Sequence, residues 1–167
     1  MLRGSGAQMG SGRWRSSKGF LLLHCSNATR THTIPEPILV LSGLSYAVPA
    51  CLAYRQGRSY SVGTNHYLLA TTVGFHGTRQ EWIFLLDCTA IINFLWHSYI
   101  LSQQARTNAR IFFAASTAYS LLSYCVGWRY QILSFHPDWN TQMFFHAWMH
   151  ISTSYSMYKL LEESQDV

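Results

Sequence analysis

The chain has 167 residues, of which 49% are hydrophobic, 15% aromatic and only 11% charged, with a formal net charge of +5. A soluble domain usually carries about a quarter charged residues, so this composition favours a chain embedded in a membrane. It excludes a basic nucleic-acid-binding domain, whose Lys and Arg side chains would line one folded face. The charges here gather near the N-terminus and in short breaks between apolar runs.

The first 33 residues form a basic segment rich in Ser, Gly and Thr, and the first acidic residue of the chain is Glu36. A cationic, acid-free start is typical of mitochondrial targeting sequences, which are attracted by anionic lipid and by a negative-inside potential. A secretory signal is less favoured because its apolar part, 19–25, is short. A basic tail with no targeting role is the alternative. The composition changes where Pro35 and Pro37 precede the first long apolar run.

Residues 34–162 contain five apolar segments, each close to the roughly 20 helical residues that cross a hydrocarbon core of about 30 Å. They run from about Ile38 to Tyr54, Tyr60 to Gly77, Trp82 to Ser102, Ala109 to Trp128 and Thr141 to Leu161. We predict an all-α membrane protein, a bundle of about five transmembrane helices followed by a tail at 163–167. Pro49 should kink the first helix. The second segment is the most polar and should face protein or a cavity.

The connections between the segments are short, so neighbouring helices should be antiparallel. We call side B the end at which the second segment stops and the third starts, and side A the opposite end. Side A carries Arg55, Arg58, Arg106, Arg110 and Lys159, and side B carries Arg79 and Arg129. The positive-inside rule places side A in the matrix or cytosol if the basic N-terminal segment is removed. If that segment stays, the two sides nearly balance and the orientation is open.

Ionisable side chains inside a membrane are costly and are therefore candidates for function. His76 lies at the B end of the second segment, and Asp87 lies about one and a half turns into the third. His146 and His150 lie within about the first three turns of the fifth segment. These four residues from three helices thus share one membrane depth.

His146 and His150 are four residues apart, so on a helix their imidazoles share a face and can bind one metal ion. A third ligand from His76 would give a three-His site with an open position, as in catalytic zinc sites. Asp87 could orient a ligand or take the proton of zinc-bound water, whose pKa zinc lowers to about 7. Spacing alone leaves the alternative of a merely polar helix face open.

The other histidines and the cysteines have weaker claims. We interpret His66 and His97 as hydrogen-bonded residues of the bundle, and His136 and Asp138 as part of a solvated turn at side B. The cysteines are far apart and form no CxxC pair, so neither a thiolate zinc site nor a disulfide framework is indicated. They are interpreted as small apolar fillers.

Two segments resemble the signatures of a known family. The segment TVGFHGTRQEWIFLLD, which contains His76 and Asp87, resembles the signature of the second and third helices of alkaline ceramidases. The segment FFHAWMHISTSYSMY, which contains His146 and His150, resembles their last helix. These enzymes belong to the CREST superfamily of membrane hydrolases, alongside the progestin and adiponectin receptor proteins. The two motifs occur in the family's order and together cover about a fifth of the chain.

The resemblance implies zinc held by His76, His146 and His150, with Asp87 at the metal-bound water. Thr72 stands where the family has Ser, and with zinc it could stabilise the oxyanion. The implied reaction is hydrolysis of a lipid amide, in ceramidases the N-acyl bond of ceramide, so membrane lipids such as sphingolipids are the implied substrates. The family has seven transmembrane helices, whereas this chain has room for about five. The family's acidic calcium-binding stretch has no counterpart here.

Two functions from different classes therefore stay open. One is a compact zinc-dependent lipid amide hydrolase. The other is a non-catalytic subunit of a large complex in the mitochondrial inner membrane, built on a shortened ceramidase-like scaffold. A lipid-sensing receptor domain is the least favoured reading, and no nucleic-acid partner is indicated. The basic N-terminus favours the mitochondrial inner membrane, with the endoplasmic reticulum or Golgi as the alternative.

Overall fold

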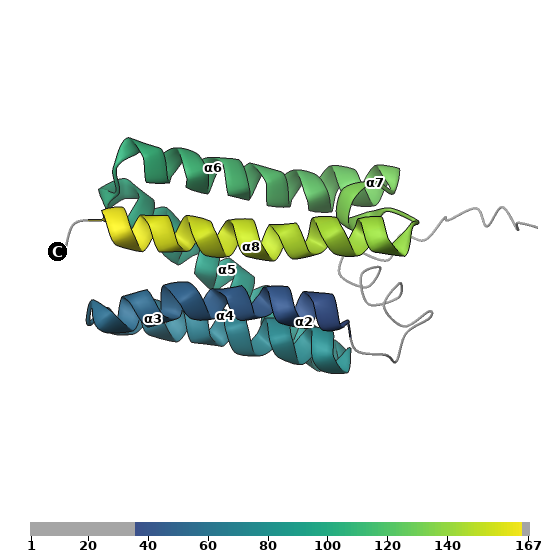
Figure 1. Ribbon diagram of the computed structural model, residues 1–167, viewed down its shortest axis with the longest axis horizontal. Coiled ribbons are helices and arrows are strands. Elements are labelled where there is room, and N and C mark those ends of the chain that lie inside the picture. The colour runs from purple at the N-terminus through teal and green to yellow at the C-terminus, as the bar shows by residue number, and fades with distance from the viewer. Residues whose placement is uncertain (1–35, 165–167) are drawn as a thin grey trace, which may run out of the picture. The chain divides into compact units, whose positions relative to one another are not determined.

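The computed structural model describes residues 36–164, so the basic segment at 1–33 and the end of the tail lie outside the described residues. Over the described range the chain forms five helical rods (Figure 1). The first combines α2 (Pro37–Gly43), the 3-10 helix η1 (Leu44–Tyr46) and α3 (Ala47–Arg55), the second is α4 (Ser59–Thr78) and the third is α5 (Glu81–Gln104). The fourth combines α6 (Thr107–Leu122), the π-helical segment η2 (Ser123–Gly127) and α7 (Trp128–Tyr130). The 3-10 turn η3 (Leu133–Phe135) connects it to the fifth, which is α8 (Trp139–Glu163). The all-α bundle predicted from the sequence is confirmed.

Three of these rods are long and apolar enough to cross a membrane, namely Pro37–Arg55, Glu81–Gln104 and Thr107–Tyr130. The helices α4 and α8 have comparable lengths of 20 and 25 residues. Their composition sets them apart, because they contain many hydroxyl groups and the histidines of the predicted site. Both polar helices pack against the first rod, while α4 also packs along α5 and α8 along α6. In Figure 1, α8 runs between α6 on one side and α2–α3 on the other.

The first rod is interrupted near its middle, as Pro49 predicts. The 3-10 turn η1 separates α2 from α3, and Pro49 lies in the first turn of α3. Because proline has no N–H, the carbonyl of Ser45 four residues earlier loses its helical donor. The hydroxyl of Ser154 on α8 donates to this carbonyl at 2.8 Å. The break therefore becomes a contact between the first and the last rod.

Local features end the helices at side B. Arg79 follows α4 in the left-handed region, with φ of 59°. Gly127 lies where the chain leaves α6, and a Cβ atom there would come within 2.8 Å of the carbonyl oxygen of Ile132. Asp138 caps α8, because its carboxylate accepts from the backbone N–H of Thr141 at 2.9 Å and from its hydroxyl at 2.7 Å. These helix ends determine which residues of the helices lie near side B.

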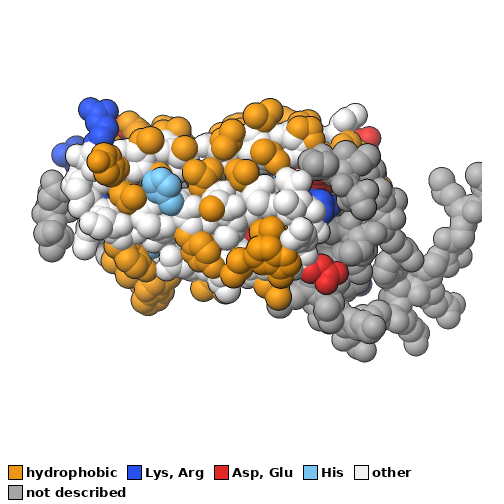
Figure 2. Space-filling view, turned by 90° about the horizontal axis from the view of Figure 1, so that it is seen from below, with side chains coloured by type: hydrophobic (Ala, Val, Ile, Leu, Met, Phe, Trp, Pro, Cys, Tyr) orange, Lys and Arg blue, Asp and Glu red, His pale blue; other side chains and the backbone are white. Residues whose placement is uncertain are grey.

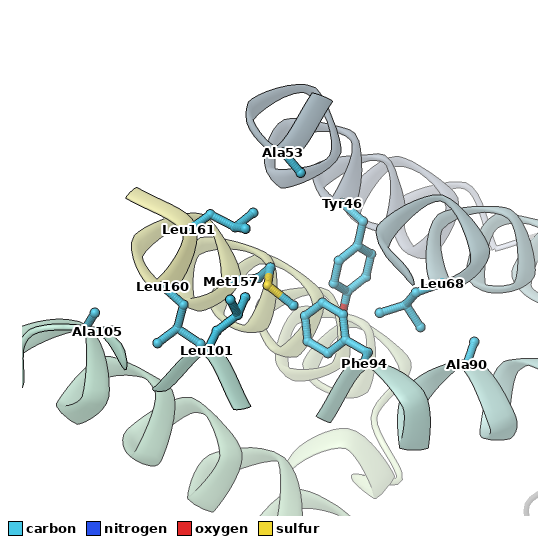
Figure 3. Close-up of a cluster of buried hydrophobic side chains, with 11 residues drawn as sticks. Tyr46, Ala53, Leu68, Ala90, Phe94, Leu101, Ala105, Met157, Leu160 and Leu161 are labelled. Carbon is cyan, nitrogen blue, oxygen red and sulfur yellow. The ribbon is translucent and has the colours of Figure 1, made fainter. Parts of the chain in front are cut away.

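An apolar cluster fills the part of the bundle toward side A (Figure 3). Tyr46, Leu68, Phe94 and Met157 come from four different rods and are all buried. The rings of Tyr46 and Phe94 meet edge to face with centroids 5.5 Å apart. The outer surface also carries many large apolar side chains (Figure 2), including Ile92 at 67% exposure. This pattern suits a bundle whose exterior faces lipid.

Candidate metal centre

Three histidines from two helices meet in the part of the bundle near side B. His76 lies in the last turn of α4, and His146 and His150 lie on one face of α8. All three are buried, and one ring nitrogen of each lies within 4.8 Å of the others. Their ring centroids are 5.1 Å (His76 to His146), 5.3 Å (His76 to His150) and 5.0 Å (His146 to His150) apart. The cluster predicted from the sequence could thus hold a metal ion.

The donor set fits zinc in number and chemistry. Zinc takes imidazole nitrogens at about 2.0–2.1 Å, which places ligand nitrogens roughly 3.3 Å apart in a tetrahedral site. The observed nitrogens lie within 4.8 Å of one another, so they would move closer together when an ion binds. Within residues 36–164, the three histidines form the one such cluster of potential ligands. Three protein ligands leave a fourth position open.

His76 has a buried carboxylate behind it. Its Nδ1 lies 3.0 Å from Oε2 of Glu36, a residue that is only 2% exposed. The guanidinium of Arg79 donates to the same oxygen at 2.6 Å. The backbone N–H of Glu36 also donates to the carbonyl of His76 at 3.0 Å. The start of α2 is thereby bonded to the end of α4 at the histidine cluster.

His150 has a hydroxyl behind it. Its Nδ1 lies 2.9 Å from Oγ of Ser42 on α2, and this hydroxyl is also 3.1 Å from the carbonyl oxygen of Leu39. The ring of Tyr46 lies against His150, with centroids 6.1 Å apart. The phenol of Tyr46 forms a hydrogen bond with the hydroxyl of Thr153 at 2.7 Å. The first rod thus contacts both helices that supply the histidines.

Asp87 and Thr72 are brought together beside the cluster. Thr71 and Thr72 on α4 donate to the same oxygen, Oδ1 of Asp87, at 2.9 and 2.8 Å. Thr72 precedes His76 by one turn on the buried face of α4. Asp87 is buried, with 7% exposure. It lies outside the group of three potential ligands, and its role beside a metal stays a prediction.

The remaining histidines within residues 36–164 form hydrogen bonds within the bundle or its connections. His97 pairs with the hydroxyl of Ser61 at 2.7 Å, and Nδ1 of His66 lies 2.9 Å from the carbonyl oxygen of Val62. His136 accepts from the backbone N–H of Asp138 at 3.0 Å in the turn before α8. These observations agree with the interpretation of the three as structural residues.

Glu36 and Ser42 were not predicted as parts of the site. A signal for Glu36 was present, because an acidic residue directly before the first apolar segment must lie at the same end of the bundle as His76. Ser42 gave no comparable signal, since hydroxyl residues occur throughout the apolar segments.

Comparisons of the chain with protein-family models, with characterised proteins and with solved structures give no match.

Proposed function

We propose that the chain is a zinc-dependent membrane hydrolase that cleaves an amide bond in a lipid. The observation that carries this proposal is the buried cluster of His76, His146 and His150 on two packed helices. Three imidazoles suit zinc, and a site with three protein ligands keeps one position for chemistry. The two segments that resemble alkaline ceramidases contain the same three histidines and support the same class of reaction.

The depth of the cluster supports a lipid substrate. His76 is two residues before the end of α4, which is about 3 Å along the helix axis. His146 is seven residues after the start of α8, which is about 10 Å. The cluster therefore lies near one membrane surface, where the amide of an N-acylated lipid joins the headgroup to the acyl chain. An N-acyl sphingolipid could present this bond without leaving the bilayer.

The residues around the cluster supply the proton transfers. Zinc bound to the three histidines would polarise the substrate carbonyl and lower the pKa of a water molecule to about 7. Asp87 would accept a proton from the attacking water and deliver it to the leaving amine. Thr71 and Thr72 hold the carboxylate through Oδ1, so Oδ2 keeps its lone pairs for this proton. A hydroxyl has one proton, and because Thr72 donates it to Asp87 we assign Thr72 the orientation of Asp87 instead of an oxyanion contact.

Metal analysis and lipid hydrolysis test the proposal on the full chain purified in detergent. We expect one zinc per chain, lost in His146→Ala, and release of fatty acid from N-acyl sphingosine in mixed micelles. His97→Ala is the matched control, since His97 is a buried histidine that bonds to Ser61. It should keep its zinc. A wild-type protein without zinc would refute the metal centre, and a zinc-loaded protein that hydrolyses no lipid amide would refute the activity.

We propose as a second candidate a subunit of a larger complex in the mitochondrial inner membrane. The outer face of α4 favours it, because that face is more polar than a surface in contact with lipid would be. Tyr60, Gly63 and His66 are exposed there. Glycine within a helix costs about 0.5–1 kcal/mol relative to alanine. A Cβ atom at Gly63 would meet nothing within 4 Å, so packing within the described residues does not explain this glycine, whereas close approach by another helix would.

Native electrophoresis of mitochondrial membranes in mild detergent tests the second candidate. We expect comigration with a large complex that Gly63→Leu disrupts and that Ala118→Leu leaves intact. Ala118 is also exposed, but on α6. A chain that migrates as a monomer, or that fractionates with another membrane, would contradict this role.

A further inference from the structure

We propose that Glu36 is a positioning residue of the metal centre, which holds His76 in the tautomer that presents Nε2 to the metal. This inference rests on the metal site proposed above and adds to it the binding atom and the group that selects it. A histidine that binds a metal through one nitrogen usually donates its other N–H to a carboxylate or carbonyl, and that partner fixes the tautomer and the ring orientation.

The contacts of Glu36 determine the direction of its bond to His76. Arg79 donates to Oε2 of Glu36 at 2.6 Å, so the buried carboxylate is paired with a cation and is ionised. An ionised carboxylate has no proton and can only accept hydrogen bonds. The 3.0 Å contact from Nδ1 of His76 to the same oxygen is therefore an Nδ1–H donor bond. A neutral imidazole with its proton on Nδ1 keeps the lone pair of Nε2 for a metal.

The backbone keeps this carboxylate in place. The N–H of Glu36 donates to the carbonyl of His76 at 3.0 Å, and the carbonyl of Glu36 accepts from the N–H groups of Leu39 and Val40, both at 2.9 Å. Glu36 is thus bonded to the end of α4 through its main chain and through its side chain. The main-chain bond keeps Glu36 next to His76, so its carboxylate stays within reach of the imidazole.

A parallel contact is present at His150. The hydroxyl of Ser42 lies 2.9 Å from Nδ1 of His150 and 3.1 Å from the carbonyl oxygen of Leu39. A hydroxyl has one proton, so Ser42 accepts from Nδ1–H of His150 when it donates to Leu39. In that arrangement His150, like His76, would present Nε2 to the ion.

The tautomer can be measured without metal. In the metal-free full chain labelled with 15N-histidine, NMR should show the Nδ1–H form for His76. We expect Glu36→Ala to convert His76 wholly or partly to the Nε2–H form. Glu36→Gln, which keeps an acceptor oxygen, should retain most of the Nδ1–H form. Glu81→Ala is the matched control, because it removes an exposed carboxylate at the same end of the bundle. An unchanged tautomer in Glu36→Ala would overturn the inference.

Metal affinity gives the second readout. Loss of such a supporting carboxylate typically weakens metal binding about 10- to 100-fold. We expect this loss of zinc affinity in Glu36→Ala, a smaller loss in Glu36→Gln, and near wild-type affinity in Glu81→Ala. A Glu36→Ala protein that is folded and binds zinc as tightly as wild type would refute the positioning role. If the wild-type chain itself binds no zinc, the metal site fails while the tautomer result still stands by itself.

Discussion

The carboxylate of Asp87 is held by two hydroxyl groups of the neighbouring helix. Thr71 and Thr72 donate to one of its oxygens, at 2.9 and 2.8 Å. An ionised carboxylate inside a membrane is costly, and two hydroxyl donors replace only part of its hydration. A cation held by the histidines would stabilise this charge, because opposite charges attract strongly where the dielectric constant is low and Thr72, which contacts Asp87, lies one turn from His76 on α4. At the scale of single residues, Asp87 and the histidine cluster therefore support each other.

The substitution Asp87→Asn should separate binding from catalysis. The amide keeps the size of the side chain and an acceptor oxygen for the two threonines, but it cannot take a proton. We expect zinc content to be unchanged and the rate of lipid amide hydrolysis to fall about 10²- to 10⁴-fold, the usual contribution of a general base. Zinc analysis and fatty-acid release on one preparation check this. Retained hydrolysis in Asp87→Asn would remove Asp87 from the proposed reaction.

The sequence contained enough to identify the histidines but not their partners. Spacing on a helix and depth in the membrane brought His76, His146 and His150 together, since both follow from helix geometry alone. Glu36 and Ser42 bind these histidines through contacts between rods. Such contacts depend on how the first rod is rotated about its axis, and neither the spacing of apolar residues nor the length of a segment determines that rotation.

At the scale of the helices, Pro49 shows how a break in one rod is compensated by another. The carbonyl of Ser45 lacks its α-helical donor and accepts from a backbone N–H of the 3-10 turn and from the hydroxyl of Ser154. We expect Ser154→Ala to destabilise the bundle by about 1 kcal/mol. In a Pro49→Ala background the restored N–H can bond to Ser45, so the same substitution should have a smaller effect. Thermal unfolding of the four variants in detergent measures the coupling. Equal effects in both backgrounds would contradict this account.

The start of α8 should respond to acid. The hydroxyl and the backbone N–H of Thr141 donate to the carboxylate of Asp138 and hold its pKa below the ordinary value. Because the pKa is lower in the folded state, the capping bond contributes stability above the unfolded pKa. That contribution is lost as the pH falls through the lower, folded pKa. Protection against hydrogen exchange in the first turn of α8, measured relative to the intrinsic rate at each pH, should therefore fall at acidic pH.

The matched variant for this experiment is Asp138→Asn, which keeps a capping oxygen but does not titrate. In this variant, hydrogen exchange in the first turn of α8 should lack the part of the acid response that protonation of Asp138 causes in the wild type. An identical acid response in both proteins would assign that response to another group.

The helices themselves were predictable because a bilayer demands a fixed length. Each observed end of the five rods lies one or two residues from the predicted one. The π-helical segment at Ser123–Gly127 was not predicted. A π-helical turn holds one more residue than an α-helical turn, and the spacing of apolar residues in the sequence does not reveal so short a change. The two polar helices were less apparent than the others as membrane helices, because their buried faces carry the site.

At the scale of the whole molecule, the described residues divide their charge unequally between the two ends of the bundle. Side A carries five cations and two acidic residues, namely Arg55, Arg58, Arg106, Arg110, Lys159, Glu162 and Glu163. Side B carries two cations and three acidic residues, namely Arg79, Arg129, Glu36, Glu81 and Asp138. Cationic ends stay on the negative side of a membrane. If the basic segment at 1–33 is removed, this difference predicts that side A faces the matrix in the mitochondrial inner membrane, or the cytosol in another membrane.

Single cysteines at the two ends test this orientation. Asn108 and Asn140 are both exposed, the first in the opening turn of α6 at side A and the second at the start of α8 at side B. In mitochondria stripped of their outer membrane, a membrane-impermeant maleimide should label Asn140→Cys directly. It should label Asn108→Cys only after the inner membrane is permeabilised, with the wild-type chain as the background control. The reverse pattern would contradict the charge argument. The expected result would place the histidine cluster near the intermembrane surface, so lipid would reach it from the outer leaflet of that membrane.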